Sequence, residues 1–312
     1  MYKFSLGNFI SESNQLLENV EIAYHIFGEL APEKKVIWVC HALTANSDAQ
    51  DWWPNFIGKN LTLDTEKYTI VCANILGSCY GTSFQKQEKL PLITIRDMVK
   101  LHQELAKFLQ ISEIELLLGG SLGGMQCLEW AIAEPDFIKK LFVIATNAKH
   151  SAWGIAFNEA QRMALELDEN GIDAARAIAM LSYRNYATFE ATQTDEEEKL
   201  ENYRAASYQR HQGEKLRKRF SKESYFMLSK AMDSHHLGRG RNSVENALNQ
   251  ITAETLVIGI DSDILFPVSE QKFIAENIHN AKLEVISSLY GHDGFLIETE
   301  KISTLLKKHF NL

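Results

Sequence analysis

The chain has 312 residues, of which 45% are hydrophobic and 23% charged, as expected for a globular protein with material for one large core. Its formal net charge is −9, from 41 acidic against 32 basic residues. This balance argues against a nucleic-acid partner, which would require a concentrated basic face. The one basic cluster, at 215–219, is interpreted as a solvated helix face.

The four cysteines, Cys40, Cys72, Cys79 and Cys127, lie far apart and lack the spacing of metal ligands. Three of them fall in or beside apolar patterns, so we expect buried free thiols and no metal site. No apolar run approaches the ~20 residues of a membrane-spanning helix, and no apolar segment of signal-peptide length follows the first residues. A cytoplasmic setting without membrane association is therefore expected.

Apolar runs and helical spacing alternate along the first half of the chain. They predict buried strands at 36–40, 68–73, 114–118 and 141–145, with helices at 95–109 and 125–133. Strands that alternate with helices, each strand an almost continuous apolar run, indicate a mostly parallel sheet with helices on both faces.

The pattern changes after this sheet. From about 151 to 249 the chain has helical periodicity and many charged residues, with no convincing strand, and two further strands are predicted at 255–260 and 282–286. A helical insertion between two sets of strands is the plan of an α/β-hydrolase fold with a cap. We therefore assign 1–150 and 250–312 to the core and 151–249 to a helical cap, or lid.

The strongest local motif is the glycine-rich turn around Ser121. It has the form Gly119-x-Ser121-x-Gly123, directly after a predicted strand and directly before a predicted helix, which is the context of a nucleophile elbow. The helix amino terminus supplies free N–H groups and a positive dipole end that favour an oxyanion. The alternative is a glycine-rich turn with a structural serine.

An oxyanion hole is predicted from two backbone amides. In this fold one N–H follows the nucleophile, here Leu122, and another comes from the loop after the first core strand, here Leu43. Losing one such donor typically costs about 10²–10³ in rate. In the same loop His41 has no assigned role, since it could simply close the end of the strand.

A serine nucleophile needs a general base, and in this fold the chain order is Ser, then Asp or Glu, then His. Asp261 and Asp263 both follow the strand at 255–260, and the residues alone do not separate them. His292 occupies the loop after the last strand and is the predicted base; the alternative is a surface loop histidine.

Several segments together resemble one known family. They are 41–44, 74–81, 119–126 with 128–130, 157–162, 211–213 with 219–220, 237–240 and 291–296. With these segments the chain resembles the homoserine O-acetyltransferases, over nearly its whole length. The combination is far more specific than the elbow alone.

The resemblance implies roles that the residues alone do not give. It selects Asp263 as the triad acid, and it implies that Arg176 meets the carboxylate and Asp293 the ammonium group of an amino-acid substrate. From the residues alone, Arg176 would be an exposed helix arginine. The resemblance further implies acetyl transfer from acetyl-CoA to L-homoserine on the route to methionine, no permanently bound cofactor, and a homodimer formed through the cap helices.

Three departures from the family pattern leave the acyl donor and the acceptor open. They are Ala45-Asn46-Ser47 after Thr44, the segment 82–85 after Gly81, and a shorter segment before Arg176, and we expect them to line the entrance. Alternatives are an acyltransferase that uses succinyl-CoA or serine, an esterase with water as acceptor, and a non-catalytic binding protein with the same fold.

Overall fold

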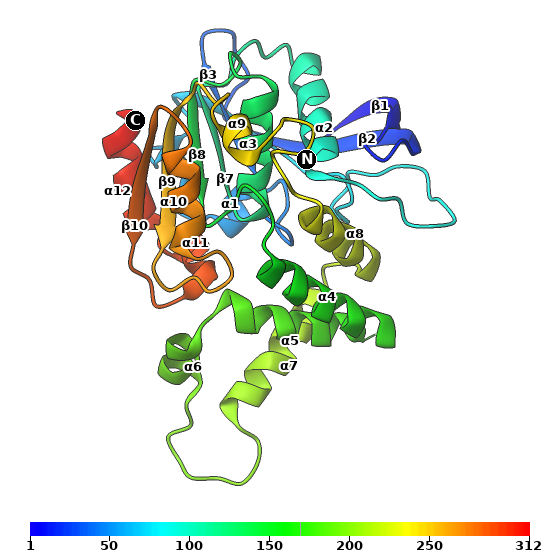
Figure 1. Cartoon of the computed structure of the whole chain (residues 1–312), viewed down its shortest axis with the longest axis vertical. Helices are drawn as coiled ribbons and strands as arrows, with labels where there is room; N and C mark the ends of the chain where they lie inside the picture. The colour runs from blue at the N-terminus through cyan, green and yellow to red at the C-terminus, as the bar shows by residue number, and fades with distance from the viewer. Residues whose placement is uncertain (169) are drawn as a thin grey trace.

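The computed structural model describes residues 1–168 and 170–312, and in this part of the chain its main sheet has eight strands in the order β1-β2-β6-β3-β7-β8-β9-β10 (Figure 1). These strands are β1 (Tyr2–Ile10), β2 (Leu16–Phe27), β3 (Lys35–Cys40), β6 (Tyr68–Ala73), β7 (Leu116–Gly120), β8 (Lys140–Ile144), β9 (Glu254–Ile260) and β10 (Ala281–Ile286). The short strands β4 (Ile57–Gly58) and β5 (Leu63–Asp64) form a separate pair.

From β6 through β10 all neighbouring strands are parallel, which confirms the predicted sheet. The hairpin of β1 and β2 was not predicted, and it joins the sheet antiparallel through β6. Strand β7 runs through Gly119 and Gly120, which the sequence assigned to the turn. The helix that follows accordingly begins at Leu122 rather than at Met125.

Both faces of the central strands of the sheet are buried. Along β3, Trp38 faces one apolar cluster, while Ile37 and Val39 face a second cluster on the opposite side. Residues of α2 (Ile95–Phe108), α3 (Leu122–Ala133), α9 (Val244–Leu248) and α10 (Val268–Glu276) contribute to the first cluster; residues of α1 (Ala49–Trp52), α11 (Gly294–Ile297) and α12 (Thr299–Phe310) contribute to the second. This two-sided burial explains why the strands are nearly continuous apolar runs.

In the described part of the chain between β8 and β9, five helices gather at one end of the sheet, whereas α9 packs beside α3 on a face of the sheet (Figure 1). The five are α4 (Ala152–Leu167), α5 (Gly171–Tyr183), α6 (Tyr186–Gln193), α7 (Arg204–Arg217) and α8 (Lys222–Asp233). Side chains of Ser151, Asn185 and Ser221 accept backbone N–H groups and so begin α4, α6 and α8. These helices lie beyond the carboxyl ends of the parallel strands.

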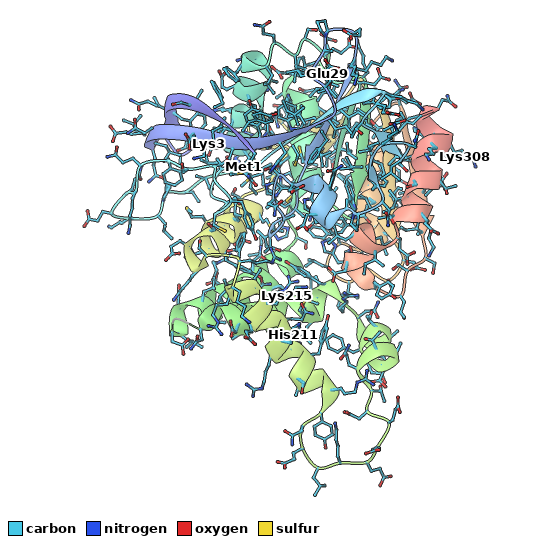
Figure 2. The ribbon with its side chains drawn as sticks, turned by 180° about the vertical axis from the view of Figure 1, so that it is seen from behind. Met1, Lys3, Glu29, His211, Lys215 and Lys308 are labelled. Carbon is cyan, nitrogen blue, oxygen red and sulfur yellow. The ribbon has the colours of Figure 1, made fainter. Side chains whose placement is uncertain are left out.

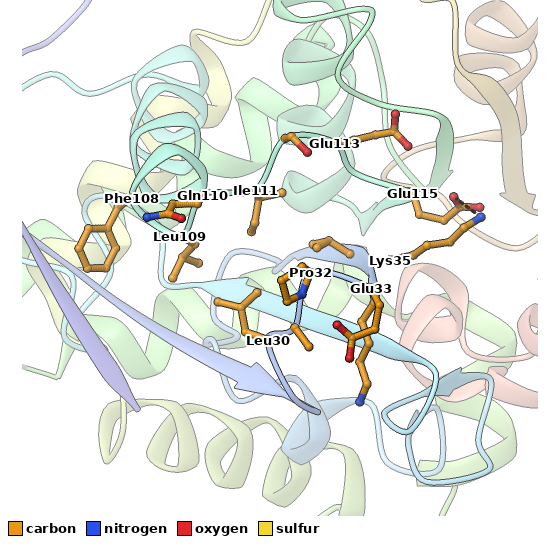
Figure 3. Close-up of a pocket in the computed structure, with 14 residues that line it drawn as sticks. Leu30, Pro32, Glu33, Lys35, Phe108, Leu109, Gln110, Ile111, Glu113 and Glu115 are labelled. Atoms are coloured by element: carbon orange, nitrogen blue, oxygen red, sulfur yellow. Dashed lines mark ion pairs between the residues drawn. The ribbon is translucent and has the colours of Figure 1, made fainter.

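A cavity of about 780 Å³ lies at the amino end of the sheet, between the turn before β3 and the segment that joins α2 to β7 (Figure 3). An ion pair of 2.8 Å between Lys35 and Glu115 lies beside it. The residues that follow β7, β9 and β10 are at the other end of the strands, so this cavity is remote from the predicted site. No helix among the described residues is both long and apolar enough to cross a bilayer.

Candidate active site

The turn after β7 holds Ser121 in a strained conformation. Its φ of 56° and ψ of −126° lie outside the regions that most L-residues adopt, and it directly precedes α3. A Cβ on Gly123, in the first turn of α3, would lie 2.1 Å from the carbonyl oxygen of Cys40, so this position tolerates only glycine. The backbone around the serine is therefore that of a nucleophile elbow.

Three side chains from separate loops meet at the carboxyl edge of the sheet. Ser121 Oγ lies 2.9 Å from His292 Nε2, and His292 Nδ1 lies 2.7 Å from Asp263 Oδ2. His292 belongs to a 3₁₀ turn, η1 (Gly291–Asp293), and all three residues are buried. Because Nδ1–H donates to the carboxylate, Nε2 is left to accept the serine proton, as a general base must.

The two candidate acids have different surroundings. Asp263 Oδ1 accepts the backbone N–H groups of Leu265 and Phe266, at 2.8 and 2.9 Å, while Oδ2 faces the histidine. Asp261 is exposed and accepts the backbone N–H of Ser288 at 3.2 Å. The geometry therefore brings Asp263, and not Asp261, to the imidazole.

The loop after β3 is fixed from within by His41. Its Nε2 accepts the backbone N–H of Ile75 at 3.1 Å, and its Nδ1 therefore donates to the carbonyl of Ala42 at 2.9 Å. Burial lowers the pKa of His41 to about 4, so the ring is neutral near pH 7. Sequence reasoning left this histidine without a role, and the structure makes it a support of the predicted oxyanion loop.

The two predicted oxyanion donors are free. In the described part of the chain, the N–H groups of Leu43 and Leu122 donate to no other protein group. Leu122 is the first residue of α3, where an N–H has no partner within the helix. Both amides are thus available to a ligand.

A cavity of about 620 Å³ opens above the serine and contains the two residues assigned to substrate binding. Ser121, His292, Leu43, Arg176 and Asp293 all line it. Arg176 comes from α5 in the cap and is only partly exposed, so its interpretation as an exposed helix arginine is wrong. The cavity thus places a cation and a carboxylate beside the predicted nucleophile.

Several side chains that line the cavity were not predicted from the sequence. Tyr183, at the end of α5, lies with its ring centroid 5.7 Å from that of His292 and 5.3 Å from the Arg176 guanidinium carbon. Trp52 and Tyr80 also line the space. Trp52 and Tyr183 come from segments with no sequence signal of their own, and Tyr80 lies in the resemblance segment 74–81 without a predicted role; only the tertiary fold brings the three side chains to this cavity.

The four basic residues of the cluster 215–219 are exposed, as predicted, but they have different neighbours. Arg217 pairs with Asp173 and Lys218 with Glu214, away from the site. Lys215 and Arg219 also line the cavity, and Figure 2 shows Lys215 nearer to the core than His211 on α7. The i, i+4 spacing of these two cations, which puts them on one side of the chain, was the available signal.

The first and second departures from the family pattern have different positions. Ala45 and Asn46 line the cavity, as expected. The segment 82–85 does not: Thr82 Oγ1 donates to the carbonyl of Asn74 at 2.6 Å, and Ser83 forms a bridge to Glu21 of β2. The expectation that this second segment lines the entrance is wrong, because it completes the sheet edge instead.

All four cysteines are free thiols, and three are buried. Burial raises the pKa of the Cys40 and Cys72 thiols. A neutral thiol is a weak nucleophile, so these buried cysteines are packing residues. Cys79 is exposed, near the carbonyl of Arg219.

Comparison with known proteins shows the family and the fold of the chain. A family model described as the alpha/beta hydrolase fold matches residues 35–299. The homoserine O-acetyltransferase of Cyclobacterium marinum is 41% identical to this chain and covers 96% of it, with 92% of its own length aligned. The chain belongs to the homoserine O-acetyltransferase family, within the α/β-hydrolase fold.

Other comparisons extend the family to solved structures. The homoserine O-acetyltransferase of Chlorobium chlorochromatii is 38% identical, over 97% of this chain and 93% of its own. The crystal structure of the Staphylococcus aureus homoserine O-acetyltransferase superposes with a TM-score of 0.87 at 28% identity, covering 100% of this chain and 95% of that one. An acetylester hydrolase from Corynebacterium glutamicum, at 20% identity and a TM-score of 0.87, covers 100% and 96% and shares the fold.

Proposed function

We propose that this protein transfers an acetyl group from acetyl-CoA to the hydroxyl of L-homoserine by a ping-pong mechanism. The observation that carries the proposal is the Ser121–His292–Asp263 hydrogen-bond chain in a cavity that Arg176 and Asp293 also line. A simple esterase has no need for this cation and carboxylate. Relatives about 40% identical over most of the chain bear the name of this activity.

In the first half-reaction His292 accepts the proton of Ser121 as Oγ attacks the thioester carbonyl carbon. The developing oxyanion receives hydrogen bonds from the Leu43 and Leu122 amides, which are preorganised and free of other partners. The carbon–sulfur bond then breaks, and the coenzyme A thiolate leaves with the proton from His292. An acyl-serine remains.

In the second half-reaction the hydroxyl of the acceptor takes the place of the thiol. His292 removes its proton, the oxygen attacks the acyl carbon, and the Ser121 Oγ regains the proton as its ester bond breaks. Arg176 would bind the acceptor carboxylate and Asp293 its ammonium group, which would orient the hydroxyl toward the ester. The nucleophile and base are buried beneath the cap helices, an arrangement that keeps water from the acyl-serine.

The proposal is tested by mixing the protein briefly with acetyl-CoA or succinyl-CoA and measuring the mass of the intact protein by mass spectrometry. The increase in mass identifies the acyl group on Ser121, and its loss when L-homoserine or L-serine is added identifies the acceptor. Ser121→Ala is the control, because it keeps the cavity but cannot form the ester. If the rate of thiol release does not change when either amino acid is added, the transferase proposal is refuted and an esterase is favoured.

We also propose that the protein is a homodimer formed through the cap helices. Large apolar side chains of α4 and α5 are exposed: Trp153, Met163, Leu167 and Leu181 are 53%, 62%, 79% and 52% accessible. Met163 and Leu167 lie one turn apart on α4, and exposed apolar neighbours of this kind are the side chains that a partner would cover. Light scattering should give twice the chain mass, and Met163→Glu with Leu167→Glu should shift it to the monomer; a monomeric unmodified protein would refute the proposal.

We place the reaction in the cytoplasm, where free thiols such as the four cysteines here remain reduced. The product, O-acetylhomoserine, would then serve methionine synthesis. Cell fractionation with an antibody against the chain tests the location.

A further inference from the structure

The carboxylate of Asp293 lies between the cavity and an arginine behind it. Asp293 lines the cavity together with Ser121 and Arg176, and its Oδ2 is 2.9 Å from Nε of Arg184. Arg184 does not line that cavity; it faces a separate hollow of about 160 Å³, beside Tyr290. The arginine therefore approaches the carboxylate from the side opposite to the predicted substrate.

This ion pair is largely withdrawn from water. The Arg184 and Asp293 side chains are only 18% and 15% exposed. A charge pair in such surroundings is screened less than one at the surface and holds its geometry better. In the described part of the chain neither oxygen of Asp293 accepts a hydrogen bond of standard geometry, and Oδ2 is held by the ion pair with Arg184. One carboxylate oxygen is thus held from behind, and the other remains for a cation in the cavity.

The backbone and side chain of Arg184 are themselves fixed. Its backbone N–H donates to the carbonyl of Met180 at 3.1 Å and ends α5. Its guanidinium carbon lies 5.3 Å from the ring centroid of Tyr290, within the range of a cation–π contact. Tyr290 directly precedes the 3₁₀ turn that carries His292 and Asp293, so the arginine contacts this turn from both ends.

The residues after Arg184 join the cap to two loops of the triad. Asn185 Nδ2 donates to the carbonyl of Ser262, the neighbour of Asp263, at 3.2 Å. The Thr188 hydroxyl donates to the carbonyl of Leu289 in the loop before His292. The cap segment 184–188 is thus anchored to the core at both sides of the ion pair.

From this arrangement we propose that Arg184 is a positioning residue for the acceptor. It holds the Asp293 carboxylate from the cap, so that the free oxygen meets the ammonium group of the amino acid. The inference rests on the proposed function. Without the arginine, Asp293 would sample other rotamers, and ammonium binding would lose its preorganised partner. Acylation of Ser121 does not use this group and should proceed as before.

The test compares two cap arginines that each form an ion pair with an aspartate. Arg217 Nε lies 2.9 Å from Asp173 Oδ1, the same distance as Arg184 Nε from Asp293 Oδ2, but the Arg217 pair is more exposed and contacts no loop of the triad. Arg184→Met and the control Arg217→Met are assayed with L-homoserine and with 4-hydroxybutyrate, which has the same hydroxyl chain and carboxylate but no ammonium group. Labelling of Ser121 by a serine-directed phosphonate monitors the nucleophile separately.

For Arg184→Met we expect the KM for homoserine to rise about tenfold, because misplacing a binding group by ~1 Å can cost up to ~10²-fold. The kcat/KM for 4-hydroxybutyrate and the phosphonate labelling should stay unchanged, so the preference for homoserine falls by the same factor. Arg184→Lys, which keeps the charge, should recover part of that preference. It also provides the test if the methionine variant does not fold.

The proposal is overturned if Arg184→Met has the same kinetic constants as Arg217→Met. It is also overturned if kcat/KM falls equally for homoserine and 4-hydroxybutyrate, or if the KM for homoserine falls. A fall would mean that the arginine merely neutralises Asp293. If the proposed function itself is wrong, the unmodified protein will release thiol at a rate independent of homoserine. That result is visible before any variant is made, and it would overturn both proposals.

Discussion

Replacing Asp263 by Asn should lower kcat by about 10⁴, because the hydrogen bonds around this carboxylate leave an amide only one orientation. Oδ1 accepts two backbone N–H groups, at 2.8 and 2.9 Å. An amide NH₂ turned toward them would leave two buried donors without an acceptor, at about 1–3 kcal/mol each. The amide oxygen therefore stays on these donors, and the NH₂ group faces His292.

An NH₂ group facing His292 Nδ1, where the carboxylate now lies at 2.7 Å, forces that nitrogen to be the acceptor. The proton then sits on Nε2, and the ring can no longer accept the proton of Ser121, which lies 2.9 Å away. A loss of about 10⁴ corresponds to ~5.5 kcal/mol in the activation barrier. The fold should be preserved, because Asn keeps the shape of Asp and both backbone contacts.

Thiol release from acetyl-CoA in the presence of homoserine measures this effect, with thermal unfolding as the check on the fold. Asp261→Asn is the matched control: it lies two residues earlier in the same loop, is exposed, and does not contact the imidazole. It should retain nearly full activity. A loss below about tenfold in Asp263→Asn, or equal losses in both variants, would refute the tautomer argument.

Other predictions concern the supports of the site. Gly123→Ala puts a Cβ 2.1 Å from the Cys40 carbonyl oxygen and should destabilise the fold by roughly 1–3 kcal/mol or more, seen as a lower Tm; an unchanged Tm would contradict the close contact. His41→Phe removes both hydrogen bonds of the oxyanion loop, and kcat should fall about 10²-fold while phosphonate binding persists; unchanged kcat would leave the loop independent of the imidazole. Burial lowers the pKa of His41 and His150 to about 4 and of His235 to about 3. Since the unfolded chain binds these protons near pH 6.5, the free energy of unfolding should fall as pH drops from about 6.5 to 4, by up to ~4 kcal/mol per pH unit; urea titrations at pH 7 and 5 that give equal values would exclude this linkage.

The sequence predicted those parts of the fold whose signal is local. Strand β3 was found within one residue because both of its faces are buried, which makes it a continuous apolar run. Strand β1 was not predicted, because its residues are mostly exposed or half-buried and lack a clear apolar face. The short strand β4 has only two residues, too few for any periodicity.

The site residues, too, were predictable only where the sequence carries a local signal. Ser121 was recognisable because the elbow is a contiguous motif between a strand and a helix. Asp261 and Asp263 could not be separated by pattern, since both follow the same strand and only their hydrogen-bond partners differ. Arg184 had no signal at all, because its partner lies 109 positions further along the chain and the contact exists only in the folded protein.

The anchoring of the cap has a consequence for how substrates arrive. Swinging α5 and α6 away as a hinged flap would break the contacts of Asn185 and Thr188 with the core, together with the Arg184 ion pair. Turnover would then disassemble, in every cycle, the surroundings of its own base. We therefore expect coenzyme A and the amino acid to enter the cavity in turn while α5 and α6 stay in place.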